Sequence, residues 1–165
     1  MPLSTAEASV QTAGYRKVLW LPGTASSNSV ATLTGGTVKD VTYSFTDSGF
    51  DPGGTQNNVT DNRYTLTQVL YQPGTVDYPP FDVTYVWGGA SAVAKAALAD
   101  GTAGFFVVRY AVANATTLTI GQLVDIIPVL TGYSFKQPPS QNGLELLKQR
   151  MFVTGLVQKD VALVA

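Results

Sequence analysis

The chain contains no cysteine and no histidine, and these absences exclude most common catalytic and metal-binding chemistry. Without cysteine there is no disulfide framework, no thiolate nucleophile and no cysteine-ligated zinc site. Without histidine the chain lacks the commonest general base near neutral pH and the commonest metal ligand. An enzyme is therefore the least favoured class, and we expect no catalytic residue, no metal site and no cofactor.

Charge is also scarce. Charged residues make up 13% of the 165 residues, with a net charge of −1, whereas about a quarter is usual in soluble proteins. No basic block exists, and proteins that grip DNA rely on lysine and arginine contacts to phosphates, so tight DNA binding is not expected. So weakly charged a surface suits a protein that covers much of itself with further copies of the same chain.

Long apolar runs are missing as well, since no run in the sequence reaches the roughly 18 residues that a membrane-spanning helix needs. The first residues lack the basic start and apolar core of a signal peptide. We therefore expect no membrane association, and synthesis in the cytoplasm.

The sequence is rich in β-branched residues, with 20 valines and 20 threonines. Such residues suit a pleated sheet, so we predict a mainly β, single-domain antiparallel sandwich or barrel. The apolar runs and alternations place strands at residues 16–21, 41–46, 63–71, 81–87, 104–112, 123–130 and 151–164. Residues 131–143 are predicted as a loop, and Pro128 indicates an edge or a bend in its strand.

The strands at 63–71 and 81–87 carry the clearest pattern. In the second, Phe81, Val83, Tyr85 and Trp87 share one face, which indicates a sheet with one buried side. Gln72-Pro73-Gly74 is predicted as the turn after the first strand, and Pro79-Pro80 delays the second strand to Phe81.

Other segments are predicted to be non-strand. Residues 1–14 are predicted to form a flexible N-terminal arm, and 15–165 the β domain. Within that domain, residues 47–62 are predicted as a long irregular loop, of a length that is usually functional or disordered. The alanine-rich residues 90–100 predict one short flanking α-helix.

Two groups of residues could form a ligand site, one for calcium and one for sugars. Asp47, Asp51 and Asp61 flank a glycine-rich stretch, but their spacing does not fit an EF-hand calcium loop, and turn chemistry explains them better. Trp20 and the aromatic residues of the 81–87 strand could stack on sugars, but side chains that alternate onto one face are more often core residues.

Charges of opposite sign gather in different parts of the sequence. Between Asp40 and Asp82 there are six acidic residues against Arg63 alone, whereas basic residues outnumber acidic ones from Lys136 onward. Opposite poles suit a head-to-tail contact between copies, although chance in so sparsely charged a chain explains the pattern equally well.

From Val41 onward the order and spacing of several short motifs resemble the tail tube (major tail) proteins of long-tailed bacteriophages. The resemblance is greatest to non-contractile-tailed siphophages that infect actinobacteria. In that family an Arg-Arg pair often follows the central strand, where this chain has Arg109-Tyr110. The motifs are Phe50-Asp51-Pro52, Asp61-Asn62-Arg63, Gln72-Pro73-Gly74, Tyr85-Val86-Trp87 and residues 101–109, 124–129 and 152–155.

The resemblance implies a structural virion protein. Its subunits would form hexameric rings that stack head to tail into a tube, which conducts DNA without binding it specifically. The other partners would be the tape measure, tail terminator and distal tail proteins, and the location would be the virion tail. The alternatives are a capsid decoration (cement) protein and, less favoured, a carbohydrate-binding β-sandwich module.

Loop length and the family resemblance suggest which residues join subunits. The candidates for the self-assembly interface are Phe50, Asp51, Asn57, Asp61, Arg63 and Tyr15.

Overall fold

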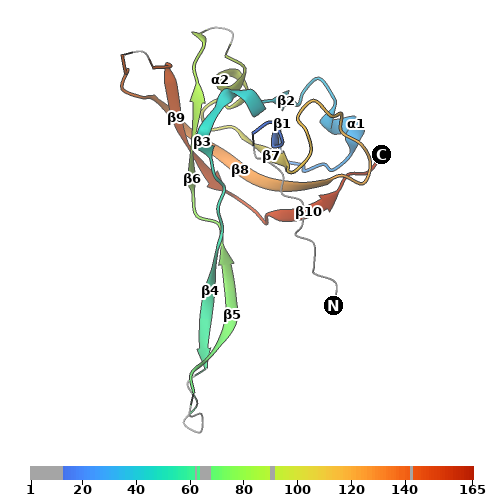
Figure 1. The fold of residues 1–165 in the computed structure, drawn as a ribbon, viewed down its shortest axis with the longest axis vertical. Helices are drawn as coiled ribbons and strands as arrows, with labels where there is room; N and C mark the ends of the chain where they lie inside the picture. The colour runs from blue at the N-terminus through green and yellow to red at the C-terminus, as the bar shows by residue number, and fades with distance from the viewer. Residues whose placement is uncertain (1–12, 62, 64–67, 90–91, 142) are drawn as a thin grey trace, which may run out of the picture.

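The structure is a computed structural model that describes residues 13–61, 63, 68–89, 92–141 and 143–165. The predicted mainly β class is confirmed, although the described residues contain a second short α-helix (Figure 1). In chain order the elements are β1 (Lys17–Pro22), α1 (Val30–Leu33), β2 (Lys39–Asp40), the 3-10 helix η1 (Thr42–Ser44), β3 (Phe45–Phe50), β4 (Thr55–Asp61), β5 (Leu70–Asp77), β6 (Phe81–Val86), α2 (Val93–Ala97), β7 (Ala103–Arg109), β8 (Leu123–Lys136), β9 (Leu146–Val153) and β10 (Gln158–Ala162).

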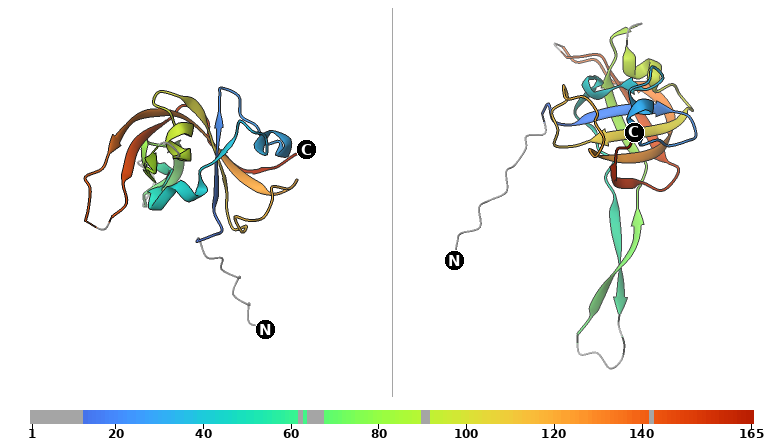
Figure 2. Two further views of the ribbon diagram at one scale, coloured as in Figure 1. Left: turned by 90° about the horizontal axis from the view of Figure 1, so that it is seen from above. Right: turned by 90° about the vertical axis from the view of Figure 1, so that its right-hand side faces the viewer.

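Eight of these strands form one antiparallel sheet in the order β2-β1-β7-β8-β9-β6-β3, with β10 paired to β8. The sheet curves strongly, as two further views show (Figure 2). We call this curved sheet with its helices the body. None of the helices in the described ranges is long and apolar enough to cross a membrane.

Strand β8 links the two halves of the body. On one edge it pairs with β10 up to Ile126, and from Val129 onward with β9. Pro128 lies at this change of partner, and its carbonyl accepts a hydrogen bond from the Thr154 amide on the same edge. The amide nitrogen and carbonyl of one strand residue point to the same edge, so the nitrogen of Pro128 also faces this edge. Its missing N–H therefore costs no ladder hydrogen bond, because β8 changes from β10 to β9 at this position.

Strand β7 separates two apolar cores. Phe106 and Val108 point into the larger core, where the Phe106 and Trp20 ring centroids are 5.0 Å apart. Val107, on the other side, packs in a smaller core with Leu33 of α1. Burial on both faces explains the nearly continuous apolar sequence of this strand.

The predicted loop at 47–62 is wrong, because most of it is strand. It comprises the end of β3 and all of β4, which pairs with β5 as a separate two-stranded sheet. We call β4 and β5 the hairpin; it projects far from the body (Figure 1). Its residues are largely exposed on both faces, so its sequence carries no apolar alternation.

The neighbouring turn prediction is also wrong. Gln72-Pro73-Gly74 lies in the middle of β5 rather than at a strand end. Proline is tolerated there because the hairpin has only two strands, and both have an unpaired edge. Part of the strand predicted at 63–71 lies outside the described residues, and β5 begins only at Leu70.

Three further element predictions needed correction. Residues 42–44 form η1 rather than strand, and Tyr43, which alternation placed on a buried face, is 79% exposed. Strand β8 extends to Lys136, into the predicted 131–143 loop. Residues 151–164 do not form one continuous strand, since they contain the end of β9 and then β10, with Gly155 between the two.

The helix and the arm are only partly described. Helix α2 covers Val93–Ala97 of the predicted 90–100, and residues 90–91 lie outside the described ranges. Residues 1–12 of the predicted 1–14 arm also lie outside them.

Candidate assembly interface

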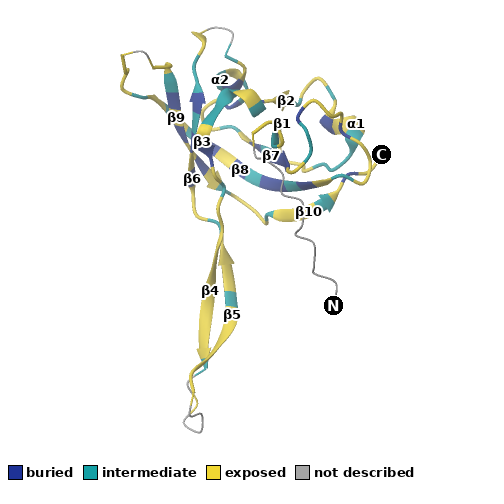
Figure 3. Ribbon diagram, viewed as in Figure 1, coloured by how far each residue is buried: buried dark blue, intermediate teal, exposed yellow. Residues whose placement is uncertain are grey.

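The hairpin exposes apolar side chains that no other described part of the chain covers. Val59, Leu70, Tyr71 and Val76 are each between 45% and 69% exposed, and the whole hairpin is coloured as exposed apart from short patches (Figure 3). An isolated two-stranded hairpin is marginally stable in water. The hairpin is therefore the element of this protein that most needs a neighbouring molecule.

Hydrogen bonds within the hairpin define its geometry. The ladder shifts register between the pairs Gln56↔Val76 and Asn58↔Pro73, so β5 carries one extra residue there, with Gly74 and Thr75 opposite Asn57. The Asn57 side-chain amide donates to the Thr75 hydroxyl at 3.2 Å. Within this bulge a Cβ on Gly74 would lie 2.7 Å from the Asn57 carbonyl oxygen, so the close approach requires glycine.

Asp61, the last residue of β4, forms an ion pair with Arg63. The Arg63 guanidinium lies 3.1 Å from the Asp61 carboxylate. The Arg63 side chain is 74% exposed, whereas that of Asp61 is 17% exposed. An exposed arginine held by a local carboxylate can contact a partner at the far end of the hairpin.

The hairpin joins the body through a root made of residues 51–54 and 78–80. The body ladder ends at the pair Phe50↔Val83 and the hairpin ladder begins at Thr55↔Asp77. No backbone hydrogen bond among the described residues joins the two segments of the root. Its sequence explains this gap, since it contains three prolines, which lack an amide donor, and two glycines, Gly53 and Gly54.

The Tyr78 side chain packs between the two segments of the root and the body. A Cβ on Gly54 would lie 2.7 Å from the Tyr78 ring, so the ring packs directly on the Gly54 backbone. The Lys159 ammonium lies 5.5 Å from the ring centroid on the body side. Tyr78 is therefore the side chain that sets the hairpin against the body.

The predicted interface residues fall in three places. Asn57, Asp61 and Arg63 belong to the hairpin and the residue just beyond β4, and Asp51 lies in the root, so the structure brings these four residues onto one projecting element. Tyr15 is 40% exposed in the bend before β1.

Phe50 lies elsewhere. It is buried in the larger core, with its ring centroid 5.0 Å from that of Phe106. In the single chain it is a packing residue.

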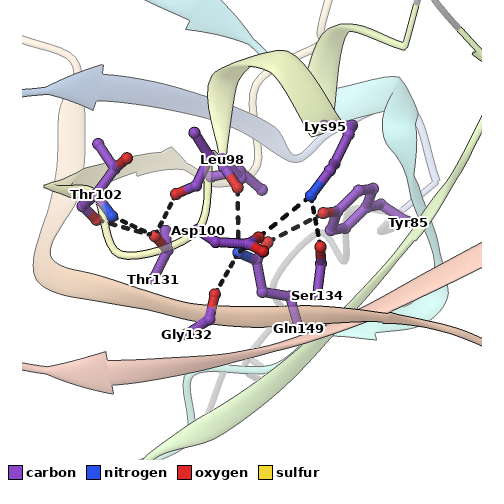
Figure 4. A network of polar contacts seen from close by, with 10 residues as sticks. Tyr85, Lys95, Leu98, Asp100, Thr102, Thr131, Gly132, Ser134 and Gln149 are labelled. Carbon is purple, nitrogen blue, oxygen red and sulfur yellow. Dashed lines mark hydrogen bonds and ion pairs between the residues drawn. The ribbon is translucent and has the colours of Figure 1, made fainter.

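A buried polar network beneath α2 is a second place where chemistry could occur (Figure 4). The Tyr85 hydroxyl donates to the Gln149 side-chain oxygen at 3.0 Å, and the Gln149 nitrogen donates to the Leu98 and Gly132 carbonyls at 3.1 and 2.8 Å. Burial, together with the Asp100 carboxylate, raises the pKa of Tyr85 to about 12. Gln149 thus fastens the segment after α2 to the sheet.

Lys95 and Ser134 lie beside this network, and a lysine next to a serine is a pairing that nucleophilic enzymes use. Here the Lys95 ammonium donates to the Ser134 hydroxyl and forms an ion pair with Asp100 at 3.2 Å. Burial acts to raise the pKa of Asp100, but hydrogen bonds from Lys95 and Ser134 outweigh it and lower that pKa. Lys95 therefore links α2 to the segment after it, through Asp100, and to β8, through Ser134.

The other candidate sites have little support from the geometry. Trp20 and Tyr85 are 1% and 0% exposed, so they cannot form a sugar-stacking platform, and Lys136 covers Trp87 at 4.4 Å. The described part of the chain has no group of three or more acidic side chains placed to hold a metal ion.

Comparison with known families decides the assignment. The family model for phage tail tube proteins matches residues 4–165. The chain belongs to the phage tail tube protein family. This tail tube protein is therefore a structural component of a phage tail. No curated protein matches it.

A solved structure shares the fold of this tail tube protein. It is a chain of the six-fold symmetrised cryo-EM structure of the anti-feeding prophage baseplate, with 8% sequence identity and a TM-score of 0.58. The match covers 93% of this chain and 96% of the other. At such low identity the likeness concerns the fold alone.

Sequence reasoning placed four of the six candidate interface residues in this segment but missed that the segment is a strand pair. The available signal was β-branched residues on both sides of the tip, with Val59 and Thr60 on one strand and Thr75 and Val76 on the other. The Asp, Asn and Gly residues around them favour turns, and that composition concealed the strands.

Proposed function

We propose that this tail tube protein self-assembles into stacked hexameric rings that form the phage tail tube, a conduit for DNA ejection. The observation that carries the proposal is the hairpin, which projects from the body with apolar side chains exposed on both faces. In a protein of this family the natural cover for it is another copy of the same chain.

The hairpin is proposed to make the contact between rings. It lies at one end of the long axis of the molecule, and the turn between β8 and β9 lies at the other (Figure 1). Near that second end Tyr133, Phe135 and Leu144 are 76%, 68% and 65% exposed. A contact between two different surfaces does not close on itself when the copies stack, so it propagates.

Edge strands are proposed to make the contact within a ring. Strand β3 ends the eight-stranded sheet, so one of its edges has no partner strand among the described residues. Edge strands pair readily with other chains, and closing a ring removes every free edge. The six-fold symmetry of the anti-feeding prophage assembly supports six as the number of copies.

The finer assignments are part of the same proposal. The tube would surround a tape measure protein, end at terminator and distal tail proteins, and let DNA pass without specific binding. The actinobacterial siphophage origin and synthesis in the host cytoplasm rest on the sequence resemblance.

Electron microscopy of purified protein over a concentration series tests the proposal. We expect tubes or stacked six-fold rings from the unaltered chain. The double variant Val59→Ser, Tyr71→Ser should remain folded but form no stacks, because it removes apolar contacts of the hairpin. Ile120→Ser is the matched control, because Ile120 is 67% exposed on the body.

Trimers, or binding to capsids, would contradict the tube and favour a decoration protein. Stacking by the double variant as efficient as that of the control would show that the hairpin does not join rings.

A further inference from the structure

The exposed face of β6 and β9 carries a cluster of three charged side chains. In the ladder Asp82 lies opposite Arg150, and Thr84 lies opposite Lys148. The Lys148 ammonium is 2.9 Å from one oxygen of the Asp82 carboxylate, and the Arg150 guanidinium is 3.8 Å from the other. The Asp82 carboxylate therefore forms ion pairs with both cations, one through each of its oxygens.

This cluster faces solvent. Residues of β9 alternate, so Leu147, Gln149 and Met151 are buried while Lys148 and Arg150 point outward. The side chains of Lys148 and Arg150 are 47% and 60% exposed. Both cations remain accessible to a ligand despite their shared carboxylate.

Among the described residues, no carboxylate other than that of Asp82 lies within ion-pair distance of either cation. On the β8 side Phe135 lies opposite Lys148 and is 68% exposed. No other ion pair of either cation occurs within the described ranges. The cluster alone carries a net charge of +1, and without Asp82 it would carry +2.

Two accessible cations on an open strand face suit the phosphates of nucleic acid. Lysine and arginine contacts to phosphates release counterions and supply most of the non-specific affinity for DNA. Repetition in every subunit of a ring would multiply that affinity, since linked weak contacts act together. A conduit in which Lys148 and Arg150 had no counterion would therefore bind DNA and slow its passage.

We propose that this face of β6 and β9 is turned toward nucleic acid, and that Asp82 is the internal counterion that keeps Lys148 and Arg150 from gripping phosphates. The proposal rests on the proposed function as a conduit. Asp82 competes with every passing phosphate for the same two cations, so DNA contacts the face but does not stay.

The test measures the binding of a short fluorescent DNA duplex to purified protein by anisotropy, over a series of salt concentrations. Asp82→Asn should bind roughly three- to tenfold more tightly than the unaltered chain at low salt, because two exposed ion pairs of ordinary strength are lost. The slope of its log affinity against log salt concentration should also be steeper, by the amount that about one to two additional phosphate contacts produce. Asp82→Glu should behave as the unaltered chain does.

Two variants make the result specific to this face. Asp160→Asn removes the same charge from an exposed position on β10 that has no ion pair in the described structure, and it should leave affinity unchanged. The triple variant Asp82→Asn, Lys148→Gln, Arg150→Gln should lose the gained affinity. Thermal unfolding of each variant checks that the fold is intact.

Equal affinities of Asp82→Asn and Asp160→Asn would overturn the proposal, as would a gain that survives in the triple variant. If the face instead packs against another copy, Asp82→Asn changes the oligomeric state while its DNA affinity stays at the control value. A tighter-binding Asp82→Asn in a protein that forms no tubes would leave the charge cluster established and refute the conduit.

Discussion

The Tyr85 hydroxyl is buried next to Gln149, and burial with the Asp100 carboxylate raises its pKa to about 12. The unfolded chain releases this proton near pH 10. Between pH 10 and 12 the unfolded state therefore binds fewer protons, so the free energy of unfolding falls as pH rises, by up to about 2–3 kcal/mol.

The variant Tyr85→Phe should lose about 1 kcal/mol at pH 8 with the Gln149 hydrogen bond. It should also lose less further stability than the unaltered chain between pH 10 and 12. Urea unfolding followed by tryptophan fluorescence measures both. Parallel stability curves for the two proteins would show that Tyr85 does not titrate in this way.

Gly104 shows how little space the larger core leaves. A Cβ there would lie 2.5 Å from the Trp20 ring and 2.8 Å from the Leu21 carbonyl oxygen. Gly104→Ala should therefore cost about 1–3 kcal/mol of stability through overpacking. Gly36→Ala is the control, since nothing lies within 4 Å of its added Cβ. Denaturant midpoints compare the two, and equal midpoints would mean that Trp20 can move aside.

Among the elements, the root has packing that can be altered without touching the core. Gly54→Ala would place a methyl group 2.7 Å from the Tyr78 ring, whereas Gly53→Ala meets only the Asp51 carboxylate at 3.5 Å. We expect the free energy of unfolding of both variants to lie within about 0.5 kcal/mol of that of the unaltered chain, since neither glycine lies in the core. Gly54→Ala should form fewer or shorter tubes in electron micrographs, because a displaced Tyr78 changes the hairpin angle. Equal tube formation by the two variants would contradict this role of Tyr78.

The elements also show where sequence reasoning succeeds. Strand β6 begins at Phe81 as predicted, because Pro79-Pro80 cannot donate to a ladder and the residues that follow alternate between core and solvent. Strands β4 and β5 have no buried face, so their order comes from backbone pairing that composition does not reveal. Four of the six predicted interface residues lie in the root, in β4 or just beyond β4, because they were chosen from a long segment that lacks the apolar pattern of core residues. The alternation in 41–46 was misleading because Val41 is buried in the larger core although it precedes the η1 turn and lies in no strand.

For the whole molecule, assembly should change the protection of the hairpin far more than that of the body. Arg63 is 74% exposed by its side chain in the single chain, so trypsin should cleave after it in the monomer. In tubes that site, together with the backbone amides of β4 and β5, should become protected, while the amides of β7 should exchange slowly in both states. Mass spectrometry of cleavage and of hydrogen exchange measures this. Equal cleavage of monomers and tubes would place the hairpin outside the contact.

The interrupted ladder at the root has a mechanical consequence. A hydrogen-bonded sheet resists bending, whereas the two segments of the root, which are rich in proline and glycine and share no backbone hydrogen bond in the described structure, bend more easily. In a stack joined by hairpins, each connection between rings would contain one such compliant joint in every subunit. A tube built this way bends by small rotations shared among many joints, while each body keeps its own shape and the bore stays open.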